Sequence, residues 1–183
     1  MVYISGGNEL LNAFEILEKL GVKTGHKVAD LGCGGAGHFT IPTAQLVGRN
    51  TNMFAVDILR SVLKSVQSKA RLEGVNNIKS VWSNLEIFGA TKIRKGSLDF
   101  ALLINMLFQS KQHENILKEA VRMLKNEGRL LIIDWNKTPS TFGPPPADRV
   151  PANHIKDTAK KLKLKLIDEF EAGNYHYGLI YEK

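Results

Sequence analysis

Three closely spaced glycines near the N-terminus most constrain the fold of this 183-residue chain. They are Gly32, Gly34 and Gly37, in the spacing G-x-G-x-x-G, and Asp30 stands two residues before the first of them. An apolar run, HKVADL, precedes the glycines, and the segment that follows them, HFTIPTAQLV, favours a helix. A strand that enters a glycine-rich turn and leaves it as a helix is typical of α/β domains that bind a nucleotide-bearing molecule.

The first 135 residues alternate between apolar runs that favour strands and amphipathic stretches that favour helices. We expect a first helix over residues 8–22, ending at Gly21. Strands are expected over residues 26–31, 51–58, 77–84, 97–105 and 128–135, and further helices over 38–47, 59–75 and 111–128. This alternation predicts an α/β fold with a parallel, doubly wound sheet.

The pattern changes after Trp135. Residues 136–151 include five of the six prolines and show no periodicity, so 136–150 is expected to be a loop that forms one wall of a substrate pocket, or else a spacer. A short helix over 152–163 and two strand-like runs around Gly173 and Asn174 follow, which predicts a hairpin. In the stretch KKLKLKLI, the alternation predicts that the leucines at 162, 164 and 166 face inward.

Composition indicates one globular domain over residues 1–183, with an N-terminal helix within 1–21. No apolar run is long enough to span a bilayer and no secretory signal is visible, so we expect a cytoplasmic protein. Cys33 is the only cysteine, which excludes an internal disulfide and predicts no metal site. The net charge of +7 permits nucleic-acid binding, but the lysines are dispersed, which favours a solvated surface. None of these features indicates an oligomeric state.

Two acidic residues define the expected ligand. Ligands of open parallel sheets bind outside the carboxyl ends of the strands, where both Asp30 and Asp57 are expected to lie. Asp57 follows Gly32 by 25 residues, and a carboxylate there accepts hydrogen bonds from ribose hydroxyls. A carboxylate at position 30 would repel the pyrophosphate of a dinucleotide but attract a cationic cofactor, such as S-adenosylmethionine with its sulfonium and ammonium groups.

With these features the chain resembles the class I S-adenosylmethionine-dependent methyltransferases. Among them it is most similar to the small ubiquinone/menaquinone-biosynthesis-like methyltransferases. The segments in question are VADLGCGGAG, FAVDI, SLDFALLINMLF, EAVRMLKNEGRLLIIDW, FGPPPADRV and YHYGLIYEK. The resemblance implies a Rossmann-like doubly wound sheet of seven strands in the order 3-2-1-4-5-7-6. It also implies that the last strand is antiparallel, with helices on both faces, and that methyl transfer is to a small molecule.

The resemblance also implies roles for individual cofactor-binding residues. Backbone groups of Gly32, Cys33 and Gly34, in the turn that Gly37 completes, would face the methionine part of S-adenosylmethionine. Asp30 would hold its ammonium group, and Asp57 its ribose. The remaining expected contacts are Ile58 and Leu85 beside the adenine, Asn84 at the adenine amino group and Asn105 at the amino end of the cofactor. Alternatively, Ile58 and Leu85 are core residues and Asn105 only caps a turn.

Related enzymes commonly place a histidine where this chain has Phe108, and phenylalanine accepts no proton. The acceptor therefore needs no base, or another residue acts as one, with His38, Tyr175, His176 and Tyr177 as candidates. The substrate pocket is expected to include Phe108, Trp135, Pro144, Arg149 and His176; Arg149 would contact an anionic substrate or merely anchor the loop.

Three other functions remain open on the sequence alone: methylation of RNA or protein, cofactor binding without catalysis in a partner subunit, and a dehydrogenase activity. The sequence N-P-P-aromatic, which is typical of amino-nitrogen methylation of bases, is absent, because the corresponding stretch is NMLF.

Overall fold

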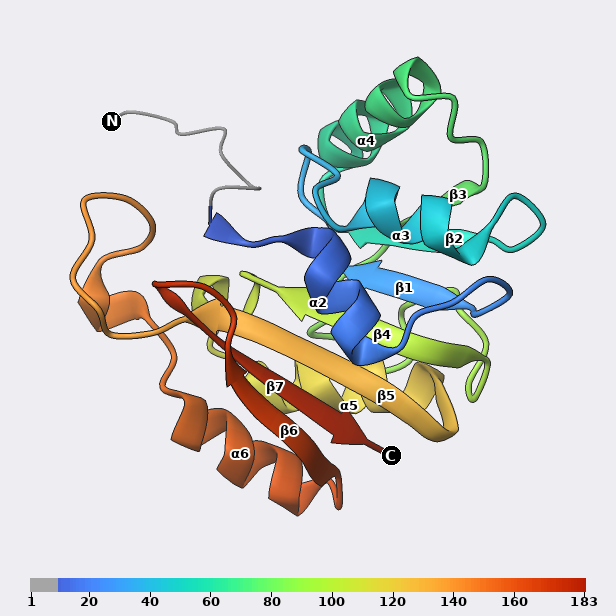
Figure 1. Ribbon diagram of the computed structural model, residues 1–183. Coiled ribbons are helices and arrows are strands. Elements are labelled where there is room, and N and C mark those ends of the chain that lie inside the picture. Colours follow the sequence, from blue (N-terminus) through green and yellow to red (C-terminus); the bar gives the residue numbers. More distant parts are fainter. Residues whose placement is uncertain (1–9) are drawn as a thin grey trace.

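The computed structural model describes residues 10–183 and contains a seven-stranded sheet in the order β3-β2-β1-β4-β5-β7-β6 (Figure 1). The strands β1 to β5 are parallel to one another, and β7 is antiparallel to both of its neighbours, β5 and β6. The predicted strand order and antiparallel last strand are therefore confirmed. The strands are β1 (Val28–Leu31), β2 (Met53–Asp57), β3 (Ile78–Trp82), β4 (Leu98–Ile104), β5 (Leu124–Trp135), β6 (Lys165–Glu171) and β7 (His176–Glu182).

Helices cover both faces of the sheet, as the alternation predicts (Figure 1). They are α2 (Ala13–Leu20), α3 (Thr40–Val47), α4 (Arg60–Leu72), α5 (His113–Met123) and α6 (Ala152–Lys161), with short 3-10 turns η1 (Leu107–Gln109) and η2 (Pro146–Asp148). The expected N-terminal helix corresponds to α2 over its described part, and residues 1–9 lie outside the described residues. Asn12 caps α2 by accepting a hydrogen bond from the Glu15 N–H, and Gly21 ends the helix with φ of +90°.

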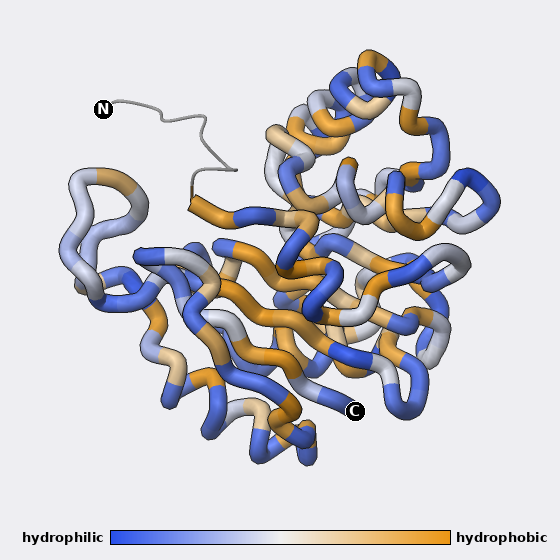
Figure 2. Tube along the Cα trace, viewed as in Figure 1, coloured by the Kyte–Doolittle hydropathy of each residue, from blue (hydrophilic) through white to orange (hydrophobic). Residues whose placement is uncertain are grey.

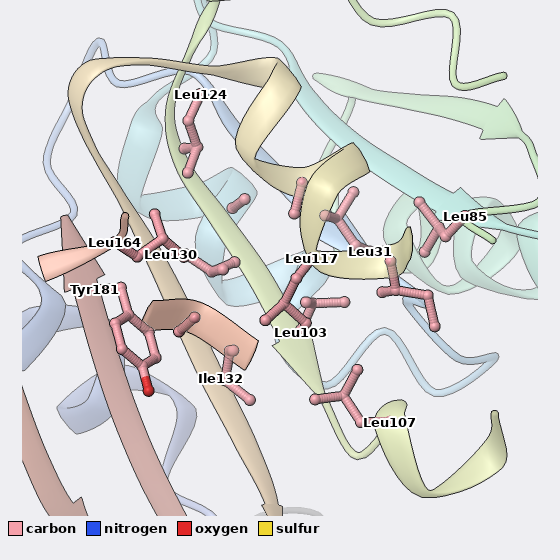
Figure 3. Close-up of a cluster of buried hydrophobic side chains, with 14 of the residues drawn as sticks. Leu31, Leu85, Leu103, Leu107, Leu117, Leu124, Leu130, Ile132, Leu164 and Tyr181 are labelled. Atoms are coloured by element: carbon pink, nitrogen blue, oxygen red, sulfur yellow. The ribbon is translucent and has the colours of Figure 1, made fainter. Parts of the chain in front are cut away.

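Besides a smaller cluster around Cys33, two large apolar cores lie between the sheet and its helices. One lies between the sheet and α5 and α6 and includes Leu103, Leu117 and Ile132 (Figure 3). The other lies against α2 and α3 and includes Leu17, Leu102 and Ile133. The strand β4 and the second half of β5 therefore bury both faces, which explains their largely apolar sequences, and Figure 2 shows apolar residues along the strands at the centre of the sheet.

Two local predictions were wrong. The helix expected to run to residue 128 ends at Met123, because Leu124 adopts an extended backbone and pairs with Leu98 at the start of β5. The inward leucine alternation also fails, since Leu166 is exposed on the edge strand β6, whose pairing with β7 shifts register between Leu166 and Asp168. A register irregularity turns successive side chains away from strict alternation, which a sequence pattern does not reveal. Leu162 caps α6 and packs, partly buried, against the core, and Leu164 is buried, so these two leucines face inward as expected.

The carboxyl ends of β1, β2, β4 and β5 lie along one edge of the sheet because these strands are parallel. This edge includes the glycine turn after β1 and the residues that follow β2, β4 and β5. Among residues 10–183, no helix is both long enough and apolar enough to cross a membrane.

Candidate cofactor and substrate site

The glycine turn connects β1 to α3, and its three predicted glycines all have positive φ, from +61° to +84°. A Cβ atom on Gly32 would lie 2.6 Å from Cγ of Met106, and one on Gly37 would lie 3.0 Å from Cδ1 of Ile41. These two glycines are therefore required for packing inside the protein. A Cβ on Gly34 would meet no heavy atom of the described residues within 4 Å, so the open side of the turn is at Gly34.

Backbone hydrogen bonds tie the turn to β2. The N–H groups of Gly32 and Cys33 donate to the carbonyl of Val56, at 2.8 and 3.0 Å, so these donors face the protein and not the open side. The side chain of Cys33 is buried beside Leu63 and Val66. Burial, together with the nearby carboxylates of Asp30 and Asp57, raises the pKa of the Cys33 thiol far above its usual range, which excludes a reactive thiolate.

Asp30 lies beneath the turn near the end of β1 and is only 2% exposed. Its Oδ2 atom accepts a hydrogen bond of 2.6 Å from the Thr40 hydroxyl at the start of α3. Burial raises the pKa of Asp30 to about 6, although the Thr40 hydrogen bond opposes this effect. The site therefore contains a carboxyl group that a cation would favour in its ionised form.

Asp57 ends β2 and lies next to the open side of the turn. Its Oδ1 accepts from the Leu59 N–H at 2.9 Å, and its Oδ2 is 3.4 Å from the Gly34 nitrogen. The following residue, Ile58, is 54% exposed, so it is not a core residue. The structure thus places the Asp57 carboxylate beside Gly34, and the exposed Ile58 side chain follows it at the end of β2.

The segment after β3 meets this region from the other side. The Asn84 side chain is half-buried, and its Oδ1 accepts from the Glu86 N–H at 2.9 Å. Leu85 points into the core with Leu31, as Figure 3 shows, which matches the alternative interpretation of that residue. A groove of about 1040 Å³ lies along β3, and its lining includes Asn84 and the exposed side chains of Ile58, Trp82 and Ile87.

Asn105 follows β4 in a left-handed conformation, with φ of 52°. Its N–H donates to Ile133 and its carbonyl accepts from the Gln109 side chain, at 2.8 and 2.9 Å. Its Oδ1 atom is buried and has no hydrogen-bond partner among residues 10–183. Asn105 precedes Met106, whose side chain packs on Gly32.

Phe108 lies in η1 and packs, half-buried, against the core beneath α5 and α6. The turn is held by Asp134, a residue near the end of β5 that the sequence analysis missed. Asp134 is fully buried, and its Oδ2 accepts from the N–H groups of Leu107 and Phe108 at 3.0 and 3.3 Å. The available signal was a single charged residue within the apolar run LLIIDW.

The loop over residues 136–150 is anchored by Arg149, which is 4% exposed. Its guanidinium donates to the carbonyls of Asn136, Thr138 and Pro144 at 2.6–3.0 Å and to the Ser140 hydroxyl at 2.7 Å. Most of its donors are thereby used within the loop. Of the two roles expected for Arg149, the geometry supports loop anchoring, with Pro144 as one of the anchored residues.

An aromatic group lies between this loop and the hairpin. The His176 and Trp135 rings have centroids 4.2 Å apart, and Phe142 is edge-on to both Trp135 and Tyr175. A Cβ on Gly143 would lie 2.5 Å from the Trp135 ring, so only glycine fits above that ring. The structure thus brings Trp135 and His176 together beneath the loop, while Phe108 belongs to a different turn.

His176 is fully buried, and neither ring nitrogen has a hydrogen-bond partner among the described residues. Burial, with a smaller effect of the Arg149 charge, lowers the pKa of His176 to about 4. The imidazole is therefore neutral near neutral pH. Another of the four candidate bases, His38, has its Nε2 atom 2.8 Å from the carbonyl of Leu11. No group of three or more His, Cys, Asp or Glu side chains within residues 10–183 is placed to hold a metal ion.

A family model described as a methyltransferase domain matches residues 22–181. The chain therefore belongs to the methyltransferase domain family, in agreement with the strand order and the glycine turn.

Curated relatives include ubiquinone/menaquinone biosynthesis C-methyltransferases. The protein of Pasteurella multocida is 34% identical over 118 residues, which are 64% of this chain and 42% of that protein. The protein of a Marinomonas species is 30% identical over 138 residues, which are 75% and 53% of the two chains. This chain thus spans about half the length of these relatives.

Among solved structures, a SAM-dependent methyltransferase of Aquifex aeolicus superposes with a TM-score of 0.88. The two sequences are 21% identical, and the match covers 97% of this chain and 93% of that one. An arsenic(III) S-adenosylmethionine methyltransferase of Chlamydomonas reinhardtii superposes with a TM-score of 0.69 at 20% identity, covering 88% and 64%. At these identities the structures establish a shared fold.

Proposed function

We propose that this protein transfers a methyl group from S-adenosylmethionine to a small-molecule acceptor. The observation that supports this most directly is the pair of carboxylates at the glycine turn: Asp30 lies beneath the turn, and Asp57 lies beside its open position at Gly34. A cationic amino acid moiety joined to a ribose has the chemistry to engage both carboxylates, whereas a pyrophosphate would be repelled by them.

Each residue at this edge has a part in the proposal. Asp30 would bind the ammonium group of the cofactor, and Asp57 would accept hydrogen bonds from its ribose hydroxyls. Ile58 and Asn84 would contact the adenine from the end of the groove along β3. The buried Oδ1 atom of Asn105, which lacks a partner among residues 10–183, would accept a hydrogen bond from the amino end.

When bound, the cofactor supplies an electrophilic methyl group on a sulfonium. Asp30 and Asp57 would hold the cofactor so that this methyl group is open to an acceptor lone pair. The protein aligns the two reactants and excludes water, and alignment alone accounts for a large part of such accelerations. The loop over 136–150 with Trp135 and His176 would form the wall of the acceptor pocket.

We further propose that no protein base takes part. Phe108 accepts no proton. The His38 ring is hydrogen-bonded to a backbone carbonyl, and His176 is buried. The acceptor would be a thiolate, a soft metalloid or a stabilised carbanion, and Phe108→Leu should retain much of the rate. His38→Ala and His176→Ala should each lower kcat less than about tenfold, below the contribution usual for a general base. A thousandfold loss in either variant, with cofactor binding unchanged, would contradict this.

The proposal is tested by calorimetric titration with S-adenosylhomocysteine and with NADH. We expect binding of S-adenosylhomocysteine and none of NADH; the reverse result would favour a dehydrogenase. Labelled S-adenosylmethionine is then incubated with a small-molecule extract, with tRNA and with protein. Label in the small-molecule fraction supports the proposal, label in tRNA or protein supports the alternative acceptor, and binding without any transfer indicates a non-catalytic partner subunit. A cytoplasmic location is part of the proposal and is tested by cell fractionation.

A further inference from the structure

One buried group near the site has no part in the function described so far. Asp134 is fully enclosed, and its carboxylate accepts hydrogen bonds from three backbone N–H groups, those of Leu107, Phe108 and Trp135. Burial of an ionised carboxylate costs free energy, and hydrogen bonds from N–H donors reduce that cost. The three donors around Asp134 therefore favour its ionised form in the folded protein. Two of the three donors belong to η1, which is 26 or 27 residues away in the sequence.

We propose that Asp134 is a positioning residue of the methyltransferase site, acting by fixing η1 and with it the segment between β4 and α5 that would contact the cofactor. This inference rests on the proposed function, because it assigns a task to Asp134 only if S-adenosylmethionine binds at the carboxyl edge.

The segment fixed by Asp134 begins with Asn105 and with Met106, whose side chain lies beside the glycine turn. Asn105 has a left-handed backbone and an unused side-chain oxygen, and its carbonyl accepts from Gln109 at the end of η1. Met106 lies between Asn105 and η1, and its side chain occupies the space beside Gly32. A displacement of η1 would therefore move both Asn105 and Met106, which are two residues and one residue before Leu107.

The same turn is held from its opposite side by a histidine pair. His113 at the start of α5 has Nε2 3.1 Å from the Leu107 carbonyl, and its Nδ1 is 3.0 Å from Nε2 of His154 on α6. A donor is needed at the carbonyl, so neutral His113 is protonated at Nε2 and accepts from His154 at Nδ1. Leu107 is thus bound by Asp134 through its N–H and by His113 through its carbonyl.

We call the hydrogen bonds from the N–H groups of Leu107, Phe108 and Trp135 to the Asp134 carboxylate the Asp134 clamp. The ionisation of Asp134 determines how many of these hydrogen bonds form. Burial raises its pKa to about 6, and the three N–H donors oppose this effect. Protonation converts one carboxylate oxygen into a donor, which leaves at least one of the three N–H groups without its acceptor. From β7, the neighbouring Tyr177 stays neutral, because burial and the Asp134 charge raise its pKa far above neutral. From α5, burial and the neighbouring His154 on α6 lower the pKa of His113, while its bond to the Leu107 carbonyl opposes this effect, so His113 is neutral at pH 7.5.

The first test compares Asp134→Asn with Asp99→Asn. Asp99 also accepts from a backbone N–H, that of Lys27 at 2.8 Å, but it lies at the opposite end of β4 from the site. At pH 7.5 we expect Asp134→Asn to weaken S-adenosylhomocysteine binding about tenfold, the usual cost of losing hydrogen bonds to a charged group. Asp99→Asn should leave the dissociation constant within about twofold. Equal affinity of folded Asp134→Asn and the wild type would overturn the inference.

The second test uses the wild-type protein, so it does not depend on whether Asp134→Asn folds. The amide proton shifts of Leu107 and Phe108 are followed by NMR between pH 4.5 and 8. We expect both to titrate together with a midpoint near pH 6, the value for Asp134. If the ionised clamp favours cofactor binding, saturating S-adenosylhomocysteine must lower that midpoint, because the coupling is reciprocal.

Two results would overturn the inference in this second test: a midpoint that S-adenosylhomocysteine leaves unchanged, or amides that do not titrate. The failure of the proposed function is distinguishable, since in that case the wild-type protein would show no S-adenosylhomocysteine binding at all. That outcome would remove the inference together with the function on which it rests.

Discussion

At the scale of single residues, the two carboxylates of the glycine turn differ in what surrounds them. Asp30 is buried and depends on one hydroxyl, that of Thr40, for its hydrogen bond. Asp57 is half-buried, accepts from the Leu59 N–H and lies beside the open turn. Binding of a cation should therefore be linked to proton release from Asp30, whereas the contribution of Asp57 should depend on its hydrogen bonds.

Replacing Thr40 by valine should change the pH dependence of cofactor binding. The folded-state pKa of Asp30 is about 6, so S-adenosylhomocysteine affinity should be full above pH 6 and fall as the pH decreases through it. The Thr40 hydrogen bond lowers this pKa, so Thr40→Val should move the midpoint to higher pH. Calorimetry between pH 5 and 8 measures it. A midpoint that stays in place would mean that Asp30 does not meet the ammonium group.

Asp57→Ala should weaken S-adenosylhomocysteine binding by about 2 kcal/mol or more, because two charge-assisted hydrogen bonds to the ribose are lost. Asp57→Asn is the matched variant, since it retains an acceptor for the Leu59 N–H but loses the charge. It should fall between Asp57→Ala and the wild type. Calorimetry gives the dissociation constants and thermal unfolding gives the stability. An unchanged dissociation constant in Asp57→Ala would place the ribose elsewhere.

At the scale of elements, the proline-containing loop over residues 136–150 depends on one side chain. Arg149 lies at its end and binds three of its carbonyls, and its guanidinium is 5.4 Å from the centre of the Trp135 ring. Prolines restrict the backbone, but they supply no N–H groups to hold the loop against the sheet. The guanidinium therefore replaces the backbone hydrogen bonds that this segment lacks.

Arg149→Met should reduce the free energy of unfolding by about 2 kcal/mol, because buried carbonyls lose their donors. It should also make the loop sensitive to limited proteolysis. Arg60→Met is the control: Arg60 also stacks on a tryptophan, at 4.3 Å from the exposed ring of Trp82, but anchors no loop, and an exposed stack contributes at most about 1 kcal/mol. Urea unfolding measures both. Equal effects in the two variants would show that Arg149 does not anchor the loop.

At the scale of the whole molecule, the response to acid is a balance between buried groups with opposite shifts. The pKa of His176 is lowered to about 4, so its contribution to stability is complete above the unfolded value of about 6.5 and decreases as the pH falls from there to 4. The pKa values of Asp30 and Asp134 are both raised to about 6 in the folded protein. As the pH falls, the folded protein therefore takes up a proton at each carboxylate before the unfolded protein does, and its stability increases over nearly the same pH range in which His176 lowers it.

His176→Phe should therefore alter the acid response while retaining an aromatic ring against Trp135. When the pH falls from 7 to 5, His176 lowers the free energy of unfolding of the wild type by about 2 kcal/mol. The variant lacks the histidine and does not show this decrease. The variant should consequently become more stable on acidification through its two buried carboxyl groups. Urea unfolding at both pH values measures the difference. A parallel change in the two proteins would mean that His176 is accessible to protons in the folded state.

The architecture of this protein could be predicted from its sequence for two reasons. The helices, strands and turns depend on local patterns of residues, and the strand order follows from the resemblance to a known family. The period of apolar residues predicts which segments are strands and helices, the glycine spacing predicts the turn, and the resemblance supplies the strand order. Element boundaries were less predictable: Leu124 has the sequence of a helix end, but it pairs with Leu98 in the sheet. A partner outside the segment overrides the local preference there.

By itself, the sequence determined that acidic residues lie near the carboxyl ends of the first two strands of a parallel sheet, since that depends only on position along the chain. The tertiary structure alone decided three other contacts. The Met106 side chain packs against Gly32, Arg149 binds within its own loop, and Asp134 accepts hydrogen bonds from η1. Asp134 and Leu107 are 27 residues apart. Burial and hydrogen-bond geometry arise when distant segments meet, and these determine whether a charged residue contacts a ligand or holds the protein together.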